Sequence, residues 1–337
     1  MEQGREKIHA TRRALRMLAL IVTAVLVACS VTLLAFWEKK AQAAFPGKNG
    51  RIAFNAYAPG GGSPSQIFTI NPNGTGERQL THSSSVSNYS PSYSPGGTKI
   101  AWVRKGDIWE MDADGTGKHR LTSTPAYDSD PAYSPDGRKL AFARGGNSDA
   151  RGADIYLKKF KDGSVRRVTG GGHHHEFDPV FSPDGSRIAF LRERFADFDV
   201  ILGEAIATVR TDGTGLEVLT PPEVSLRGGA DWSPDGRKLV FAIYSNVSGR
   251  IQTVEADGTN RRTVFAPGPR FYPSGPVFSP DGKKIVFLND HEGRNIADPW
   301  NIWTVGAHGK NPTYLTHPSA ARRSEVGPDW GPRPTGQ

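Results

Sequence analysis

The chain has 337 residues and a formal net charge of +8, and it is rich in glycine (39) and proline (25). Beside ordinary charged and apolar fractions, this composition favours a turn-rich all-β protein over a helical or a disordered one. The single cysteine, Cys29, excludes an internal disulfide and a cysteine-based zinc site. No basic run with interleaved aromatic residues occurs, which argues against nucleic-acid binding.

Residues 1–43 have the pattern of an export segment. Residues 17–37 contain no charged side chain, and Arg12, Arg13 and Arg16 lie directly before them. A basic stretch followed by an apolar one is typical of a signal peptide or of a membrane anchor. Residues 41–43 (AQA) match a cleavage site, while residues 26–30 (LVACS) resemble a lipobox in which Cys29 is lipidated.

Cleavage after Ala43, a retained anchor and lipidation at Cys29 therefore stay open as alternatives. Each of them predicts that a bacterium exports the protein. The expected location is the periplasm, the extracellular space or the outer side of the cytoplasmic membrane.

From residue 50 onward, three landmarks recur six times each, at a spacing near the roughly 40–50 residues of a propeller blade. They are an aromatic residue before a turn, a short apolar β run, and an Asn-Gly, Asp-Gly or His-Gly turn. The aromatic residues are Tyr93, Tyr133, Phe181, Trp232, Phe278 and Trp330; the apolar runs begin at Ile52, Ile100, Leu140, Ile188, Leu239 and Ile285; the turns lie at residues 73–74, 114–115, 162–163, 212–213, 257–258 and 308–309.

Each repeat is predicted to form four antiparallel strands. In residues 134–137 (SPDG), Pro presets φ at the second turn position, Gly accepts the last position, and Asp hydrogen-bonds the local backbone. The flanking residues alternate between core and exterior, so S-P-D-G is a hairpin turn between the first and second strands. A third strand, such as residues 154–158, and a fourth after the Asp-Gly turn, such as residues 166–169, complete the blade.

The two ends of the repeat array complement each other. The first repeat lacks the strand that carries the aromatic residue, whereas residues 327–332 (GPDWGP) supply such a strand with no repeat after it. Pairing these ends closes a ring and removes exposed sheet edges. The predicted fold class is therefore all-β: a six-bladed β-propeller of four-stranded antiparallel blades, closed by a C-terminal strand, in residues 44–337, after an N-terminal signal or anchor helix in residues 1–43.

The repeated unit also carries a family resemblance. An aromatic residue, S-P-D-G, two variable residues and I/L-A/V-F, followed by D-I-W/Y and x-x-L-T, resemble the WD-like repeat of the TolB-type six-bladed propellers over residues 46–332. The resemblance implies the fold, and it implies less about function because this repeat serves many roles. TolB proper has a separate domain ahead of its propeller, whereas here Gly50 follows the export segment almost directly. The second unit reads SPGG at residues 94–97, and we expect that turn still to form.

The strand order predicts two different faces. The S-P-D-G and Asp-Gly turns share one face, which we call the S-P-D-G face. The connections between second and third strands, and those between blades, lie on the opposite, variable face. Binding residues generally lie on variable loops held by a rigid scaffold. The candidate functional loops are therefore residues 55–64, 170–178, 192–204, 266–275 and 289–299.

The sharpest chemical feature on the variable face is a run of four residues: His173, His174, His175 and Glu176. Imidazole and carboxylate groups bind zinc and other divalent metals. Because consecutive residues rarely all point at one ion, we expect a loop of solvated histidines and no cofactor. A bound divalent cation is the alternative.

Asp130 and Asp178 occupy equivalent places in adjacent repeats, directly before the proline of the innermost strand. We expect both carboxylates at the mouth of the channel, where they are hydrated, cap local amides or hold a cation. The remaining candidates are basic and aromatic, as is typical of anchors in interfaces, with packing at the rim as the alternative. They are Arg194, Phe195, Arg270, Phe271 and Tyr272, together with Arg322 and Arg323.

The sequence contains no G-x-S-x-G elbow, zincin helix motif or phosphate-binding glycine loop. We therefore predict a monomeric, exported, non-catalytic scaffold that binds a protein or carbohydrate partner at the cell envelope. Its N-terminal segment contacts the membrane if that segment stays uncleaved. The alternative is a metal-assisted polysaccharide lyase or hydrolase that uses residues 173–175 with Asp130 and Asp178.

Overall fold

The computed structural model describes most of the chain after the predicted export segment. The described residues are 45–57, 64–145, 152–170, 174–195, 201–222, 226, 228–245, 248–269, 271–291, 301–316 and 325–334. The chain divides into two units, Met1–Lys39 and Lys40–Gln337, and all described residues belong to the second. Residues 1–43 thus lie outside the described part. No helix in the described ranges is long and apolar enough to cross a membrane.

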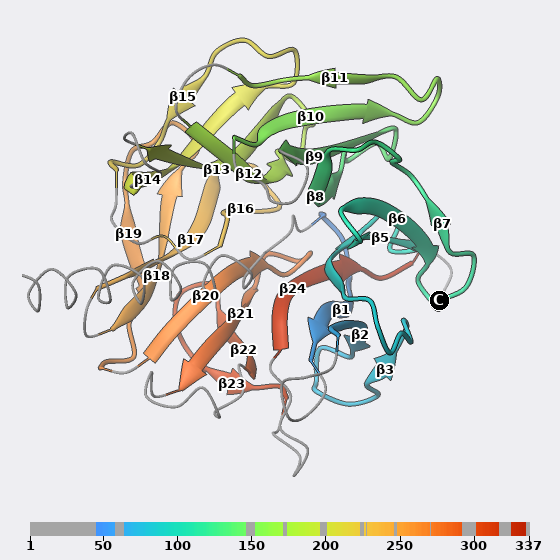
Figure 1. Ribbon diagram of the computed structural model, residues 1–337. Helices are drawn as coiled ribbons and strands as arrows, with labels where there is room; N and C mark the ends of the chain where they lie inside the picture. Colours follow the sequence, from blue (N-terminus) through green and yellow to red (C-terminus); the bar gives the residue numbers. More distant parts are fainter. Residues whose placement is uncertain are drawn as a thin grey trace, which may run out of the picture. The chain divides into compact units, whose positions relative to one another are not determined.

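The described residues form six four-stranded antiparallel sheets, the blades of a propeller (Figure 1). The strands of each blade follow one another from its inner to its outer edge. Blade 1 contains β24 (Glu325–Pro332), β1 (Asn49–Ala56), β2 (Gln66–Ile70) and β3 (Arg78–Gln79); blade 2 contains β4 (Asn88–Tyr93), β5 (Lys99–Arg104), β6 (Asp107–Asp112) and β7 (His119–Arg120); blade 3 contains β8 (Tyr127–Tyr133), β9 (Lys139–Gly145), β10 (Asp154–Lys159) and β11 (Val165–Arg167). Blade 4 contains β12 (His174–Phe181), β13 (Arg187–Phe195), β14 (Ile201–Arg210) and β15 (Glu217–Val218); blade 5 contains β16 (Asp231–Trp232), β17 (Lys238–Tyr244), β18 (Gly249–Glu255) and β19 (Arg262–Phe265); blade 6 contains β20 (Phe271–Phe278), β21 (Lys284–His291), β22 (Asn301–Gly306) and β23 (Thr313–Tyr314).

The predicted closure of the ring is confirmed, because the C-terminal strand β24 pairs antiparallel with β1. Ile52 lies opposite Trp330, and Ala53 lies opposite Asp329. Beyond the ladder, the Arg333 backbone N–H donates to the Lys48 carbonyl at 2.7 Å. Glycine is needed here for close approach, since a Cβ on Gly331 would lie 2.4 Å from the Tyr93 ring of blade 2. The last strand of the chain therefore supplies the inner strand of the first blade.

The S-P-D-G turns are built as their sequence predicts. In blade 3 the Gly137 N–H donates to the Ser134 carbonyl at 2.8 Å, and the Lys139 N–H donates to Ser134 Oγ at 2.8 Å. Asp136 Oδ1 accepts from Ser134 Oγ and from the Arg138 N–H. The expectation for residues 94–97 is also confirmed, because Gly97 donates to the Ser94 carbonyl without any aspartate.

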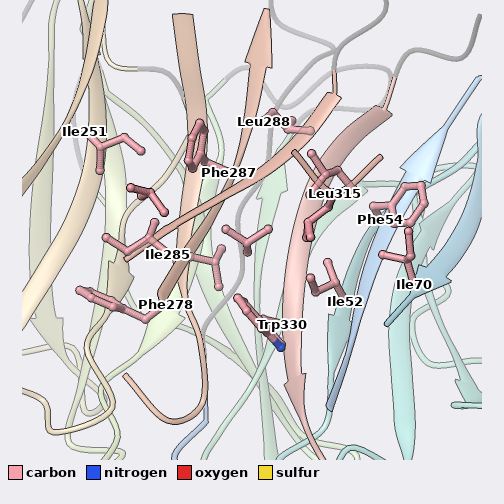
Figure 2. Packing of buried hydrophobic residues seen from close by; sticks show 14 of the residues in the cluster. Ile52, Phe54, Ile70, Ile251, Phe278, Ile285, Phe287, Leu288, Leu315 and Trp330 are labelled. Atoms are coloured by element: carbon pink, nitrogen blue, oxygen red, sulfur yellow. The ribbon is translucent and has the colours of Figure 1, made fainter. Parts of the chain in front are cut away.

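The six landmark aromatic residues pack between blades. All are at most 4 % exposed, so their predicted place in the core is confirmed: Tyr93, Tyr133, Phe181, Trp232, Phe278 and Trp330. One cluster spans blades 5, 6 and 1, and in Figure 2 Trp330 lies between Phe278 of blade 6 and Ile52 of blade 1. Apolar contact between neighbouring blades is thus continuous across the point of closure.

Two buried aspartates, which the sequence analysis left without a role, link neighbouring blades. Asp329 Oδ2 in blade 1 accepts from the Tyr93 N–H of blade 2 at 2.6 Å. Asp231 Oδ2 in blade 5 accepts from the Phe278 N–H of blade 6 at 2.8 Å. Burial raises the pKa of Asp329 to about 8, although backbone hydrogen bonds from Tyr93 and Trp330 lower it. The aspartate directly before the aromatic residue is therefore a connection between blades.

The chain enters the propeller on the S-P-D-G face. The Gly47 N–H donates to the carbonyl of Pro280, and Asn49 Oδ1 accepts from the Asp281 N–H, both in the S-P-D-G turn of blade 6. Phe45, 5 % exposed, packs in the cluster between blades 2 and 3. Residues 45–49 therefore form a strap across the ring, and in Figure 1 the blue trace into β1 starts near its centre.

Replacing Trp330 by alanine tests how much the closing strand contributes to stability. Because the indole is fully buried between blade 6 and blade 1, we expect Trp330→Ala to lower the free energy of unfolding by about 3–5 kcal/mol. Urea denaturation followed by circular dichroism measures this loss. The matched control is Trp109→Ala, which removes a half-buried indole inside blade 2. Equal losses in the two variants would contradict a special role for the closing strand.

Candidate functional site

On the variable face, blade 4 differs most clearly from the other blades. Its strands β13 and β14 have 9 and 10 residues and are the longest among the described strands. The segment 192–204, predicted as a loop, is therefore largely a strand hairpin, and that expectation was wrong. Cross-strand pairs extend to Arg194–Gly203 and Phe195–Ile201. We call residues 192–204 the blade-4 hairpin; its residues 196–200 lie outside the described part.

The blade-4 hairpin carries two of the predicted binding residues. Arg194 is exposed and Phe195 is half-buried, with its ring centre 4.0 Å from that of His175. Leu202, which the sequence analysis did not single out, is 52 % exposed on the opposite strand of the hairpin. The hairpin thus offers a cationic, an aromatic and an aliphatic side chain on a hydrogen-bonded ladder.

The histidine run lies in a strand, so the prediction of a solvated loop was wrong. His174, His175 and Glu176 belong to β12, and His173 lies outside the described residues. His174 and His175 are half-buried, and Glu176 is buried. Successive side chains of a strand point to opposite faces of the sheet. Neighbours in this run therefore do not converge on one point.

His175 begins a row of ionisable side chains across blade 4. It lies opposite Glu193, which in turn lies opposite Glu204. The distance from His175 Nδ1 to Glu193 Oε2 is 4.0 Å, and Glu204 Oε2 accepts from the Leu226 N–H. Burial, the charge and hydrogen bond of Glu204, and the charge of Asp178 raise the pKa of Glu193 to about 9. Burial and a neighbouring carboxyl both favour the protonated form of Glu193.

On the opposite face of blade 4 the acidic groups meet arginines. Glu176 Oε1 lies 3.4 Å from Arg192 Nε, and in neighbouring blade 3 Asp154 lies 2.7 Å from Arg167. Burial raises the pKa of Glu176, while a hydrogen bond from Thr169 and the charge of Arg192 lower it. Glu176 therefore contributes to the contact between blades 3 and 4.

Asp130 and Asp178 take equivalent positions, as predicted, at a bulge of the inner strand in blades 3 and 4. Both have left-handed backbone, with φ of 56° and 53°. They are 0 % and 1 % exposed, so both carboxylates are buried within the propeller. Ser129 Oγ donates to Asp130 Oδ2 at 2.9 Å. Gly229 of blade 5 lies against Asp178, where an added Cβ would approach Asp178 Cβ to 2.5 Å.

The three neighbouring candidates Arg270, Phe271 and Tyr272 do not form one site. Arg270 lies outside the described residues, as do Arg322 and Arg323. Phe271, 9 % exposed, packs edge-on against Phe265 and Trp303 in the core. Tyr272 is half-buried and stacks on Tyr244 with ring centres 5.6 Å apart. Phe271 therefore supports the rim, and the stacked tyrosines form part of it.

A polar group in blade 3 was missed by the sequence analysis. Asp128 accepts from Arg144 Nε and Nη2 at 2.6 and 2.9 Å, and the guanidinium lies over the Phe142 and Tyr156 rings. A hydrogen-bonded pair, Tyr89 and Tyr127, lies beside it. The signal in the sequence is Tyr127-Asp128 two residues before Asp130, but its partner Arg144 lies 16 residues away. This bidentate pair fixes the start of blade 3 at the variable face.

The described residues contain no group of three or more His, Cys, Asp or Glu side chains placed to hold a metal ion. Among the predicted ligands, His175 faces Glu193, and Glu176 lies near Arg192. The described candidates thus form two separate polar clusters on the two faces of one sheet.

Comparison with known proteins agrees with this architecture. The profile of the TolB β-propeller domain matches residues 43–271. The fold is similar to TolB from Acinetobacter baumannii, with a TM-score of 0.68 and 21 % identity over 86 % of this chain and 68 % of that chain. It is similar to a putative TolB from Agrobacterium tumefaciens, with a TM-score of 0.61 and 19 % identity over 84 % and 99 %. It also resembles an oligogalacturonate lyase in complex with manganese, with a TM-score of 0.53 and 15 % identity over 81 % and 75 %.

The pKa of Glu193 predicts a pH dependence of stability. A carboxyl whose folded pKa is raised from 4.5 to about 9 keeps its proton on folding and loses it on unfolding. Its contribution to stability is therefore full below pH 4.5 and is lost as pH rises from there toward 9, by about 1.4 kcal/mol per pH unit for one proton. Glu193→Gln mimics the protonated carboxyl. We expect its stability relative to the parent chain to increase from pH 5 to pH 9 in chemical denaturation.

The control for this experiment is Glu217→Gln, which changes an exposed carboxyl of the same blade that pairs with Arg187. In Glu217→Gln the free energy of unfolding should decrease with rising pH as steeply as in the parent chain. A Glu193→Gln variant whose pH profile runs parallel to that of the parent chain would show that Glu193 ionises normally in the folded protein.

Proposed function

The chain belongs to the TolB β-propeller domain family, and we propose that it is an exported, non-catalytic scaffold whose variable face binds a protein or glycan partner at the cell envelope. The fold alone does not decide this, because one fold serves many functions and the site decides among them. The proposal therefore depends on what the variable face presents.

The observation that carries the proposal is the blade-4 hairpin. Arg194 and Leu202 are exposed, and Phe195 is held by the ring of His175 at a centre distance of 4.0 Å. Arginine and aromatic side chains dominate binding energy in protein interfaces, and rigid presentation lowers the entropy lost on binding. The hairpin meets both conditions, since its side chains are held by a β ladder.

The contacts beneath the hairpin support the same proposal. The row His175–Glu193–Glu204 lies below its tip, and Glu204 accepts from the Leu226 N–H in the connection to blade 5. This polar row ties the hairpin to the next blade. The exposed residues of the hairpin are therefore oriented by the scaffold beneath them.

The alternative, a metal-assisted lyase or hydrolase, requires the predicted ligands to converge. In the described part of the chain, His175 and Glu176 lie on opposite faces of blade 4, and Asp130 and Asp178 are buried in separate blades. The likeness to an oligogalacturonate lyase is one of fold. The arrangement of these side chains therefore favours binding over catalysis.

Site-specific photo-crosslinking in intact cells tests the proposal. A photoreactive residue at Leu202 is expected to capture one defined partner, because this side chain is 52 % exposed beside Arg194. Arg194→Ala should reduce the yield at least about fivefold, as expected for an interface arginine worth more than 1 kcal/mol.

The matched control is the same photoreactive residue at Val218, which is 55 % exposed on the outer strand of the same blade. It should capture no such partner. Equal capture from both positions, or none from Leu202, would contradict binding by the hairpin. Stoichiometric metal in the purified protein, lost on His175→Ala, would favour the enzymatic alternative.

A further inference from the structure

The S-P-D-G face is positively charged at its turns. We count the charges of the five S-P-D-G turns over six residues each: 94–99, 134–139, 182–187, 233–238 and 279–284. These segments contain eight basic residues and four aspartates. The basic residues are Lys99, Arg138, Lys139, Arg187, Arg237, Lys238, Lys283 and Lys284, and the acids are Asp136, Asp184, Asp235 and Asp281. Five of the basic side chains are exposed: Arg138, Arg237, Lys238, Lys283 and Lys284. The S-P-D-G turns thus carry an excess of four positive charges, while the Asp-Gly turns of the same face add the exposed Asp114, Asp162, Asp212 and Asp257 beside Lys118, Lys161 and Lys310.

The aspartates of the turns are already engaged with their own backbone. Each Oδ1 accepts from the Ser hydroxyl two residues earlier and from the N–H two residues later, as in Asp136 and Asp281. These hydrogen bonds lower the pKa of both carboxyls against the opposing effect of burial. The four aspartates are exposed as well, but these hydrogen bonds hold them against their own turns. Among the basic side chains, Lys99, Arg187 and Lys238 pair with Glu110, Glu217 and Glu255, whereas Arg138, Lys283 and Lys284 are exposed.

A hollow in blade 3 adds a second basic feature to this face. It encloses about 200 Å³ and is lined by Lys139, Leu157, Lys159, Ser164 and Arg166. The Arg166 guanidinium donates to the Thr211 carbonyl in blade 4, which holds it at the border of the two blades. Three cations and a hydroxyl around one hollow suit a phosphate group, since charge-assisted hydrogen bonds to phosphate are among the stronger ones.

The described part of the chain begins on the same side. Residues 45–49 form the strap against the S-P-D-G turn of blade 6. Only residues 38–44 separate Phe45 from the apolar residues 17–37, and this length of chain spans at most about 30 Å. A segment retained in a membrane, or lipidated at Cys29, would thus tether the propeller by its S-P-D-G face.

We propose that the S-P-D-G face docks on an anionic phospholipid surface, with the basic turns against the headgroups and the variable face turned away from the membrane. A lysine or arginine close to such a surface contributes about fivefold to association. Membrane docking involves the face opposite the blade-4 hairpin, so it can be tested independently of partner binding by the hairpin. Docking in this way would fix the orientation of the propeller, with the blade-4 hairpin pointing away from the membrane.

The test uses the full chain reconstituted into vesicles with a quencher on their lipid headgroups. A fluorescent residue replaces either Thr98, exposed on the S-P-D-G face, or Leu202 on the variable face. In vesicles of phosphatidylcholine with one-third phosphatidylglycerol, we expect strong quenching at position 98 and little at position 202. Pure phosphatidylcholine vesicles or molar salt should reduce the quenching at position 98, because salt screens the attraction.

Charge reversal distinguishes docking from simple tethering. Arg138→Glu combined with Lys283→Glu should lower the ratio of docked to undocked protein at least about tenfold. The matched control reverses two exposed charges of the variable face, Lys105→Glu with Arg250→Glu, and should leave the ratio unchanged. Circular dichroism confirms that all variants are folded. Equal quenching at positions 98 and 202, no dependence on anionic lipid, or binding to a soluble anionic polysaccharide in place of vesicles would overturn the proposal.

Discussion

The pairing of β1 with β24 is the interaction on which the whole molecule depends. Each blade buries its aromatic residue against the preceding blade of the ring, so an open array would leave one apolar face and one sheet edge exposed. The ladder between Ile52 and Trp330, with the Asp329 carboxyl accepting from Tyr93 of blade 2, removes both. Bonds from Arg333 to Lys48, and from Gly47 to Pro280, extend this closure to the S-P-D-G turns. The first and last strands of the propeller are thereby held as neighbours.

Closure also explains how one repeat produces two unlike faces. The S-P-D-G turns are nearly identical because Ser, Pro, Asp and Gly each satisfy a local backbone requirement. A basic residue also follows in every blade that has this turn, at Lys99, Lys139, Arg187, Lys238 and Lys284. The connections on the other face have no such requirement, and in blade 4 they become an extended hairpin with Arg194, Phe195 and Leu202. A uniform face and a specialised face follow from the same strand order. The first suits contact with a repetitive surface, and the second suits recognition of one partner.

The fold could be predicted from the sequence because its determinants are local and occur six times. A Pro-Asp-Gly turn, an alternating strand and a buried aromatic residue identify a blade, and the incomplete first repeat identifies the closing strand. The candidate site is not repeated, and here prediction succeeded less. His174 to Glu176 were expected in a loop but continue the strand β12, because β13 extends to pair with them. The partnership of Glu193 with Glu204, and that of Asp231 with Phe278, depend on cross-strand register and on contacts between blades. A single sequence does not show these contacts, whereas the repeat shows the turns.

The most direct test of this account is to remove the closing strand and supply it separately. A chain ending at Ser324 lacks β24, and hydrogen exchange at the β1 amides reports whether its partner is present. If β24 closes the ring, the shortened chain unfolds at lower denaturant concentration and its β1 amides exchange rapidly, and a peptide of residues 325–337 restores their protection. Unchanged protection of β1 in the shortened chain, without the peptide, would contradict closure of the ring by β24.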